Sequence, residues 1–324
     1  MPVERVDTPE VLCLGESMAV FVPGEDGPAD QVRTWVRDVG GAESNVACAL
    51  AGLGVPTGWV SAVGDDPFGR AVVAAVAAAG VDVSGVAVDP TRPTGVYIKE
   101  ANASGSPMRY YRFGSAASDM GPDVLDRVDV AAARLVHLTG ITAALSPRCR
   151  ALIEAVLDRA PRVSFDVNWR PALWDSGAPD VLRGLAARAD IVLVGADEAE
   201  ALWGVSDPAD VRELLPEPTT LVVKQGSLGA TLIEAGEAVF EPALRVDVVE
   251  PVGAGDAFAA GFLAATLAGQ SPRRRLRAGH LHAAGALRTQ HDVAVPLPGD
   301  LVARLLDADA TTWATTHVTA RGVR

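Results

Sequence analysis

Lysine and cysteine are scarce in this sequence, and each scarcity argues against a class of protein. Only two of the 28 basic residues are lysines, Lys99 and Lys224, and the formal net charge is −13. Because no long basic run occurs, nucleic-acid binding is disfavoured. The three cysteines, Cys13, Cys48 and Cys149, are scattered without a CxxC pair. That pattern argues against a zinc site or a disulfide framework and fits a reducing cytoplasm.

Long apolar runs are also missing. No uncharged apolar stretch reaches about 18 residues, the minimum for a membrane-spanning helix. The N-terminus has no basic region followed by an apolar run, so we expect no signal peptide. Hydrophobic residues nevertheless make up 49% of the 324 residues, which is enough for the core of one large α/β domain.

Three motifs of common enzyme classes are absent. A Walker A loop needs Gly-Lys followed by Ser or Thr, but Lys99 follows Ile98 and Lys224 follows Val223. A dinucleotide fingerprint ends in Gly or Ala and lies in an early βα turn, whereas the stretch 253–258 ends in Phe and comes late. No Gly-x-Ser-x-Gly elbow occurs. A nicotinamide-dependent oxidoreductase is therefore disfavoured.

One glycine-rich stretch has the features of an anion-binding site. Gly253, Ala254 and Gly255 precede an apolar, alanine-rich run that predicts a helix to about residue 267. The free backbone N–H groups at a helix N-terminus bind anions such as phosphate. Asp256 lies in the middle of this turn. Its carboxylate either caps the helix or takes a proton from a nucleophile that attacks the phosphate.

Strands and helices alternate along most of the chain, which predicts a mostly parallel sheet with helices on both faces. Ligands of such sheets bind at the carboxyl ends of the strands. The alternation is interrupted where the strands expected at 81–88, 95–100 and 108–113 follow one another without helices. This interruption predicts a small β appendage, which the early strands near Ala19 and Trp35 are free to join. A second glycine turn, at 40–45, opens a helix.

Two glycine stretches together resemble the paired signatures of the ribokinase-like (PfkB) carbohydrate kinases. The first is Gly40-Gly41-Ala42-Glu43-Ser44-Asn45-Val46-Ala47 with Gly54 after it, and the second is Gly253-Ala254-Gly255-Asp256-Ala257-Phe258 with Gly261 after it. The resemblance covers roughly residues 11–298. Within the family, the stretches 110–118, 137–142 and 165–174 resemble 2-keto-3-deoxygluconate kinases.

The resemblance implies a Rossmann-like three-layer α/β core with a small β-sheet lid. Residues 1–308 are then one kinase domain, with the lid formed from segments near 17–40 and 81–115, and 309–324 are a C-terminal extension. ATP and Mg2+ are the implied cofactors, and a monovalent cation is left open as a third. The implied reaction is transfer of phosphate to a sugar acid, giving 2-keto-3-deoxy-6-phosphogluconate. The partners are thus small molecules, not a membrane or nucleic acid.

The resemblance also assigns roles to individual residues. Asp256 is the expected general base, and Gly253, Ala254 and Gly255 form the expected anion hole. Arg112 and Arg170 are placed at the sugar, where a guanidinium fork matches the carboxylate of an acidic sugar. Further substrate-binding residues are Gly41, Asn45, Tyr97, Tyr110 and Asp292. ATP-binding residues are Asn168, Lys224, Gly226 and Gly229, and Glu198 is expected to act on magnesium through water.

The sequence departs from the family pattern at two places. Glu250-Pro251-Val252 stand where the family often has Asp-Thr before the second glycine motif. An Asn-x-x-Glu motif associated with metal and phosphate appears as Gly195-Ala196-Asp197-Glu198, so the glutamate is kept and the asparagine is lost. Both changes put the detail of magnesium and water coordination in doubt, but not the class of reaction.

Several alternatives stay open on the sequence alone. The chain fits another kinase of the family, such as a fructokinase or ribokinase, or a non-catalytic sugar-binding protein on the same scaffold. Arg112 and Arg170 are alternatively structural arginines, Tyr97 and Tyr110 ordinary strand aromatics, and Glu198 a solvated helix charge. A lid sheet has an edge and an apolar face that commonly need a partner, so we expect a homo-oligomer in the cytoplasm.

Overall fold

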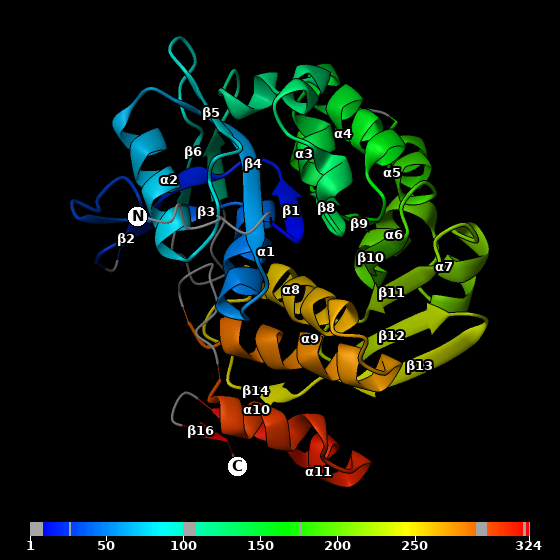
Figure 1. The fold of residues 1–324 in the computed structure, drawn as a ribbon. Coiled ribbons are helices and arrows are strands. Elements are labelled where there is room, and N and C mark those ends of the chain that lie inside the picture. The colour runs from blue at the N-terminus through cyan, green and yellow to red at the C-terminus, as the bar shows by residue number, and fades with distance from the viewer. Residues whose placement is uncertain are drawn as a thin grey trace, which may run out of the picture.

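A nine-stranded sheet forms the centre of the molecule (Figure 1). The computed structural model describes residues 9–25, 27–99, 108–174, 177–289, 297–319 and 322–323. In sheet order, the central strands are β13 (Glu237–Pro242), β12 (Gly229–Glu234), β11 (Thr220–Lys224), β10 (Ile191–Gly195), β9 (Val163–Asp166), β8 (Leu135–Thr139), β1 (Val11–Leu14), β4 (Thr57–Gly64) and β5 (Val86–Asp89). At one edge of this sheet, β12 pairs antiparallel with both of its neighbours, β11 and β13. The other strands of the described sheet pair parallel. The predicted mostly parallel α/β sheet is confirmed.

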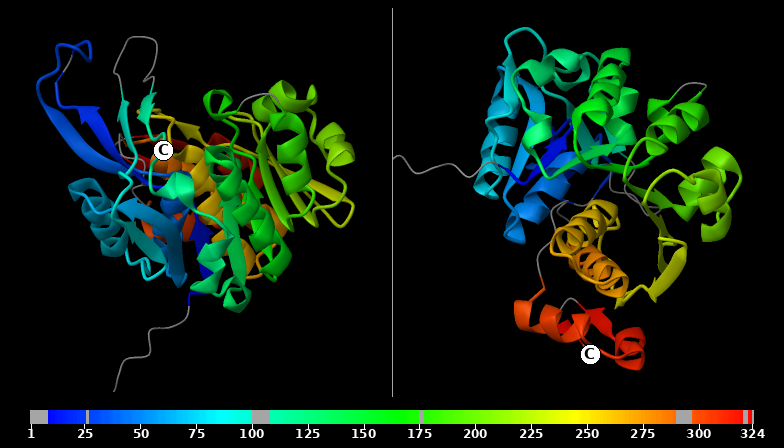
Figure 2. Two further views of the ribbon diagram at one scale, coloured as in Figure 1. Left: turned by 90° about the horizontal axis from the view of Figure 1, so that it is seen from above. Right: turned by 45° about the vertical axis from the view of Figure 1, so that its right-hand side comes forward.

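Helices cover both faces of this sheet and complete three layers (Figures 1 and 2). One face carries α3 (Gly140–Leu145), α4 (Pro147–Arg159), α5 (Ala178–Ala186), α6 (Ala196–Trp203) and α7 (Pro208–Leu214). The other carries α1 (Ala42–Gly52), α2 (Pro67–Ala78), α8 (Ala254–Leu267) and α9 (Pro272–Ala286). Short 3-10 turns lie at η1 (Ala117–Asp119), η2 (Pro122–Asp126), η3 (Val130–Ala132) and η4 (Pro171–Leu173).

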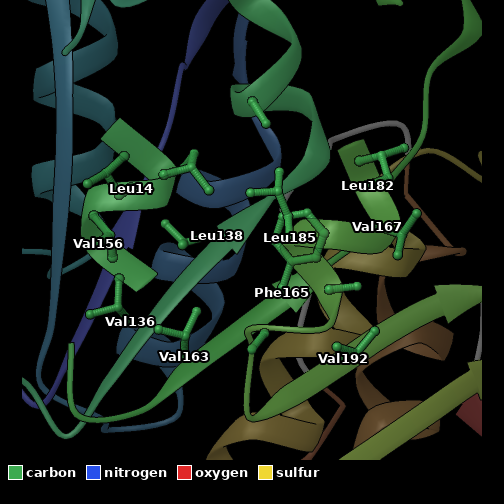
Figure 3. Packing of buried hydrophobic residues seen from close by; sticks show 14 of the residues in the cluster. Leu14, Val136, Leu138, Val156, Val163, Phe165, Val167, Leu182, Leu185 and Val192 are labelled. Atoms are coloured by element: carbon green, nitrogen blue, oxygen red, sulfur yellow. The ribbon is translucent and has the colours of Figure 1, made fainter. Parts of the chain in front are cut away.

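The central strands are buried on both faces, so their sequences are apolar runs without polar alternation. Figure 3 shows the first core cluster, in which Val136 and Val163 of the sheet lie near Val156 of α4, and Phe165 lies beside Leu185 of α5. On the other face, α8 packs between the sheet and α9, and its residues from Ala257 to Leu263 are all buried. This position explains why α8 is apolar on every side.

A separate four-stranded sheet forms the lid (Figure 2, left). Its order is β3 (Trp35–Gly40), β2 (Met18–Pro23), β6 (Val96–Lys99) and β7 (Met108–Tyr111). The assignment of 81–88 to the lid is wrong, because β5 pairs parallel with β4 in the central sheet. Helix α2 is the crossover between these two strands, so the βα alternation continues through β5 and breaks only after it.

The C-terminal segment packs against α9. It contains α10 (Gly299–Leu306), α11 (Ala310–Thr315), β15 (His317–Thr319) and β16 (Gly322–Val323), and β15 pairs with β14 (Arg245–Val246). Arg277 of α9 pairs with Glu241 and donates to the Ala308 carbonyl, and its guanidinium lies 4.7 Å from the ring centre of the fully buried Trp313. Residues 309–319 are therefore joined to the core, and a domain boundary at 308 stays a prediction.

No helix among the residues that the structure describes is long and apolar enough to cross a membrane.

Candidate active site

A cavity of about 950 Å3 lies between the lid and the carboxyl ends of the central strands. Its walls include lid strands β2, β6 and β7, the ends of β9, β10 and β11, and the first turn of α8. The predicted site residues that line it are Gly41, Asn45, Tyr97, Tyr110, Arg112, Asn168, Arg170, Glu198, Lys224, Gly226, Gly253, Gly255 and Asp256. Ala254 and Gly229 do not line it, and Asp292 lies outside the described residues.

The first turn of α8 presents its N-terminus to this cavity. Gly253 caps the helix in the left-handed region, with φ +81°, which a side chain would strain. The N–H of Ala254 makes a long bond of 3.4 Å to the Pro251 carbonyl. Glu250, where the family pattern is broken, accepts from the N–H of Val252 at 3.3 Å. At the place where the sequence departs from the family pattern, the Glu250 carboxylate thus forms a hydrogen bond within the turn that precedes α8.

Asp256 lies at the floor of the cavity and is fixed by a residue from another helix. Asn45 of α1 donates from Nδ2 to Oδ2 of Asp256 over 2.8 Å. Burial raises the pKa of Asp256 to about 7, and the neighbouring Asp166 adds to the rise. The hydrogen bond from Asn45 and the charges of Arg170 and Lys224 act in the opposite direction. The carboxyl group therefore changes protonation near neutral pH, as a general base requires.

Asp166, which the sequence analysis missed, pairs with Lys224 beside Asp256. Lys224 Nζ, at the end of β11, donates to both carboxylate oxygens of Asp166 at the end of β9, over 2.9 and 2.7 Å. Burial lowers the pKa of Lys224, but the charges of Asp166 and Glu198 outweigh it, and the net pKa is raised. Lys224 therefore keeps its positive charge in the cavity.

Glu198 is held by two backbone N–H groups from adjacent strand ends. Its Oε1 accepts from Trp169 and its Oε2 from Gly195, each over 2.8 Å. A Cβ on residue 195 would lie 2.5 Å from Oδ1 of Asp197, so the family asparagine would require the Asp197 side chain to shift. Burial raises the pKa of Glu198, while the Lys224 charge lowers it.

The acidic groups of the cavity do not form a closed metal cage. Among the described residues, no group of three or more His, Cys, Asp or Glu side chains could hold a metal ion. Glu198 and Asp197 both line the cavity near the Lys224–Asp166 pair. One or two carboxylates combined with waters and substrate phosphates are the usual environment of Mg2+, so these residues fit that ion.

The lid contributes two tyrosines whose rings meet at a tilt of 42°. Tyr97 of β6 and Tyr110 of β7 are register partners, and their ring centres are 5.4 Å apart. Tyr97 is buried, whereas Tyr110 is 39% exposed. The Arg112 guanidinium lies 5.6 Å from the centre of the Tyr110 ring. This arrangement places an aromatic wall and a cation on the same side of the cavity.

The two predicted carboxylate-binding arginines have different environments. Arg112 is 10% exposed and its Nε donates to Oε2 of the buried Glu16 over 2.6 Å. Arg170 is 51% exposed, donates to the Trp169 carbonyl over 3.1 Å, and lies 3.7 Å from Glu198. Arg112 is therefore already paired within the protein, and Arg170 is the more accessible of the two.

Three buried acidic residues were assigned no role from the sequence, although Glu43 lies in the first glycine signature and Asp166 in the stretch 165–174. Glu16 and Asp166 follow buried strands, β1 and β9, which is a signal that could have identified them. Glu43 is fully buried in the first turn of α1, where Oε1 accepts from the hydroxyls of Thr139 and Thr142 over 2.7 and 2.6 Å. Burial raises the pKa of Glu43. Through its bonds to Thr139 and Thr142, Glu43 links α1, the helix on which Asn45 lies, to β8 and α3.

Asn168 has an unusual backbone conformation beside the cavity. Its φ is +39°, in the left-handed region, although it is not a glycine, and its side chain is largely buried. Asparagine tolerates this region better than most residues. The conformation lets the chain turn from β9 toward Arg170, so both residues line the same cavity.

Comparison with known proteins gives consistent matches over most of the chain. A family model described as the pfkB family carbohydrate kinase matches residues 8–298. The 2-dehydro-3-deoxygluconokinase of Thermoproteus tenax is 38% identical over 276 residues, 82% of this chain and 84% of that protein. The protein of the same name from Bacillus subtilis (strain 168) is 36% identical over 303 residues, 90% of this chain and 91% of that protein.

Solved structures show the same fold. A PfkB protein from Polaromonas sp. JS666 superposes with a TM-score of 0.80 at 35% identity, covering 85% of this chain and 95% of that one. A putative ribokinase II from E. coli, solved in complex with ATP and Mg2+, gives a TM-score of 0.81 at 25% identity, covering 88% and 94%.

Proposed function

The chain belongs to the PfkB family of carbohydrate kinases, which use ATP, and we propose that its substrate is 2-keto-3-deoxygluconate. This is the 2-dehydro-3-deoxygluconate in the names of its relatives from T. tenax and B. subtilis. The product would be 2-keto-3-deoxy-6-phosphogluconate. The observation that carries the proposal is one cavity that holds a base, Asp256, together with two arginines, Arg112 and Arg170.

The acidic sugar fits the charge of the lid side of the cavity. A neutral hexose needs no guanidinium, whereas a sugar carboxylate gains charge-assisted hydrogen bonds from one. Arg170 is exposed to the cavity, and Arg112 lies beside Tyr110. We assign the sugar carboxylate to this side, with Tyr97 and Tyr110 as its hydrogen-bonding neighbours and Gly41 and Asn45 on the opposite wall.

The reaction follows from where Asp256 lies. As the sugar hydroxyl oxygen bonds to the γ-phosphorus of ATP, the bond from that phosphorus to the β–γ bridging oxygen breaks and ADP leaves. Asp256 takes the hydroxyl proton and later releases it to solvent. The N–H groups of Gly255 and its neighbours at the start of α8 stabilise the charge on the transferred group. Asn45 holds the carboxylate in position for this transfer.

Magnesium is part of the proposal. When bound, the ion neutralises phosphate charge, and Glu198 is the residue we assign to hold it through water, as the sequence predicts. The putative ribokinase II of similar fold was solved with ATP and Mg2+, which supports this assignment. Lys224 would supply the remaining positive charge near the phosphates, with Asn168, Gly226 and the more distant Gly229 as further predicted contacts. A monovalent cation stays open.

A substrate panel tests the proposal. Purified protein with ATP and magnesium is incubated with 2-keto-3-deoxygluconate, its galactonate-derived epimer, fructose and ribose, and ADP formation is measured. The proposal expects kcat/KM to be highest for one of the two sugar acids. Faster turnover of fructose or ribose would instead identify a neutral-sugar kinase. Sugar-dependent ADP release excludes the alternative of a sugar-binding protein without catalysis.

Two further expectations accompany the function. We propose that the protein is a homo-oligomer and acts in the cytoplasm, with small molecules rather than nucleic acid or membrane as its partners. Exposed apolar side chains on the lid and just after it, among them Tyr111 at 58% and Val36 at 52%, support an oligomer. Light scattering coupled to size-exclusion chromatography measures the oligomeric state directly.

A further inference from the structure

The lid is joined to the core at four places, and all four meet at one residue. The chain passes between the two sheets at 15–17, at Gly41, at 90–95 and at 112–116. Glu16 lies in the first of these connections. Because a lid turns about its connections, the group at which they meet controls where the lid lies.

Glu16 contacts each of the other three connections. Its Oε2 accepts from Arg112 Nε over 2.6 Å, and its Oε1 accepts from Ser115 Oγ over 2.5 Å. A Cβ on Gly95 would lie 2.8 Å from Oε1, and a Cβ on Gly41 would lie 2.3 Å from the Glu16 carbonyl oxygen. Both glycines therefore allow their connections to pass directly against Glu16.

The pair of Glu16 and Arg112 is held tightly because both charges are buried. The Glu16 side chain is 1% exposed and that of Arg112 is 10% exposed. Removing either partner leaves an uncompensated charge in a poorly solvated place, which is strongly unfavourable. The orientation of the guanidinium toward the cavity is thus fixed from the core side. Arg112 also covers Tyr110, so the same contact fixes the aromatic wall.

We propose that Glu16 is a positioning residue that couples the placement of the lid to the orientation of Arg112, and so sets the affinity for the sugar. The part that concerns an acidic sugar rests on the proposed function. Glu16 takes no proton in the reaction and transfers no group. Its effect is on sugar binding, through Arg112 and through the tyrosines of β6 and β7.

Two substitutions distinguish the contacts that Glu16 makes from the charge that it carries. Glu16→Gln can keep both contacts, since its amide oxygen accepts from Arg112 and its amide nitrogen donates to Ser115 Oγ. Glu16→Ala loses both. We expect Glu16→Ala to raise the KM for 2-keto-3-deoxygluconate at least tenfold with a smaller change in kcat. Glu16→Gln should keep that KM within threefold of the wild-type value, although its thermal stability falls.

The control is Glu10→Ala. Glu10 pairs with Arg134 in an exposed ion pair near the start of β1, away from the cavity. The Glu10→Ala variant therefore loses a carboxylate–arginine pair that does not contact the lid, and its KM for the sugar should equal that of the wild type. If Glu16→Ala does not fold, Ser115→Ala replaces it, because it removes one of the two contacts. We expect that variant to raise KM about threefold, in line with the loss of one hydrogen bond.

Three results would overturn the proposal. The first is a folded Glu16→Ala variant whose KM equals that of the wild type. The second is an equal rise of KM in Glu16→Gln and Glu16→Ala. The third, where Ser115→Ala is the variant used, is a KM that does not change. Failure of the proposed function is recognised separately, because the wild-type protein would then not phosphorylate the sugar acid. In that case the same variants are measured with the sugar that the wild type does phosphorylate, and lid placement by Glu16 still predicts a raised KM.

Discussion

The two ends of the cavity hold their charged groups in different ways. At the core end, Asp166, Glu198 and Lys224 lie at the ends of adjacent strands or just after them, and Asp256 lies in the first turn of a buried helix. At the lid end, Arg112 lies on a connection between two sheets and is held by Glu16 on another. The central sheet positions the first group, whereas a buried ion pair positions the second.

This difference suggests a division of tasks. Groups on the rigid core are suited to chemistry, because electrostatic stabilisation of a transition state needs donors and charges that do not reorganise. Groups on the lid are suited to binding, because lid closure excludes water and selects the substrate. Substitutions at the core end should therefore change kcat, and substitutions at the lid end should change KM and substrate preference.

The largest effect is expected from removing the proposed base, Asp256, at the core end. Asp256→Asn keeps the size of the side chain but cannot accept the hydroxyl proton, so kcat should fall about 10³-fold. The KM for the sugar should change little, and thermal unfolding checks that the variant is folded. Steady-state ADP formation measures both constants. A loss of less than tenfold in kcat would show that Asp256 is not the base.

The second test addresses the proposed sugar-binding arginine that the core carries, in the loop after β9. Arg170→Gln removes the accessible guanidinium, and kcat/KM for 2-keto-3-deoxygluconate should fall about 30-fold, as expected for one charge-assisted contact. Phosphorylation of fructose should change less than twofold. Arg188→Gln, which loses an ion pair with Asp158 elsewhere on the surface, is the control. Equal losses for acidic and neutral sugars would contradict carboxylate binding by Arg170.

Arg112→Gln sharpens the contrast between the two arginines. This substitution leaves the Glu16 carboxylate buried without its partner, so it should destabilise the lid as well as lose a cation. We expect kcat/KM to fall about tenfold or more for the acidic sugar and measurably for fructose too. An effect confined to the acidic sugar would assign Arg112 to carboxylate binding alone.

A smaller effect is expected on the pH dependence of kcat. Because the pKa of Asp256 is raised to about 7, activity should increase as pH rises through that value and the carboxyl group loses its proton. Asn45→Ala removes a hydrogen bond that lowers this pKa. The acid limb should therefore move to higher pH by about one unit, the equivalent of one such bond. If the acid limb of the kcat profile at saturating sugar does not move in Asn45→Ala, the hydrogen bond from Asn45 does not set the pKa of Asp256.

The smallest effect concerns stability beneath the site. Burial raises the pKa of Glu43 from its usual 4.5 in the folded protein, so the folded state holds the proton more tightly than the unfolded state. Stability is then lost as pH rises from the unfolded value through the folded one. Glu43→Gln mimics the protonated acid, so its Tm relative to wild type should improve by about 2 °C as pH rises above 4.5. A pH-independent difference would contradict a raised pKa.

The sequence predicts the local features of the site better than the contacts between distant residues, for a physical reason. The helix N-terminus around Asp256 has a local pattern, because a glycine turn and an apolar helix are adjacent in the chain. The contact of Asn45 with Asp256 joins residues from different helices, and Glu16 and Arg112 come from different connections. Such pairs have no spacing signal. The lid assignment of 81–88 was wrong because α2 was not recognised as a crossover helix.

The four connections between core and lid also bear on how the protein folds. The lid is made of two antiparallel strand pairs from separate parts of the chain, β2–β3 and β6–β7. Among the described residues, the pairing of β2 with β6, in which Ala19 lies beside Val96, joins them into one sheet. Because Ala19 and Val96 are far apart in the sequence, closing the chain between them is slow unless other structure first brings them together. The strands β1, β4 and β5 with α2 supply that structure. We therefore expect the lid to form late in folding, after the central sheet and its helices are complete.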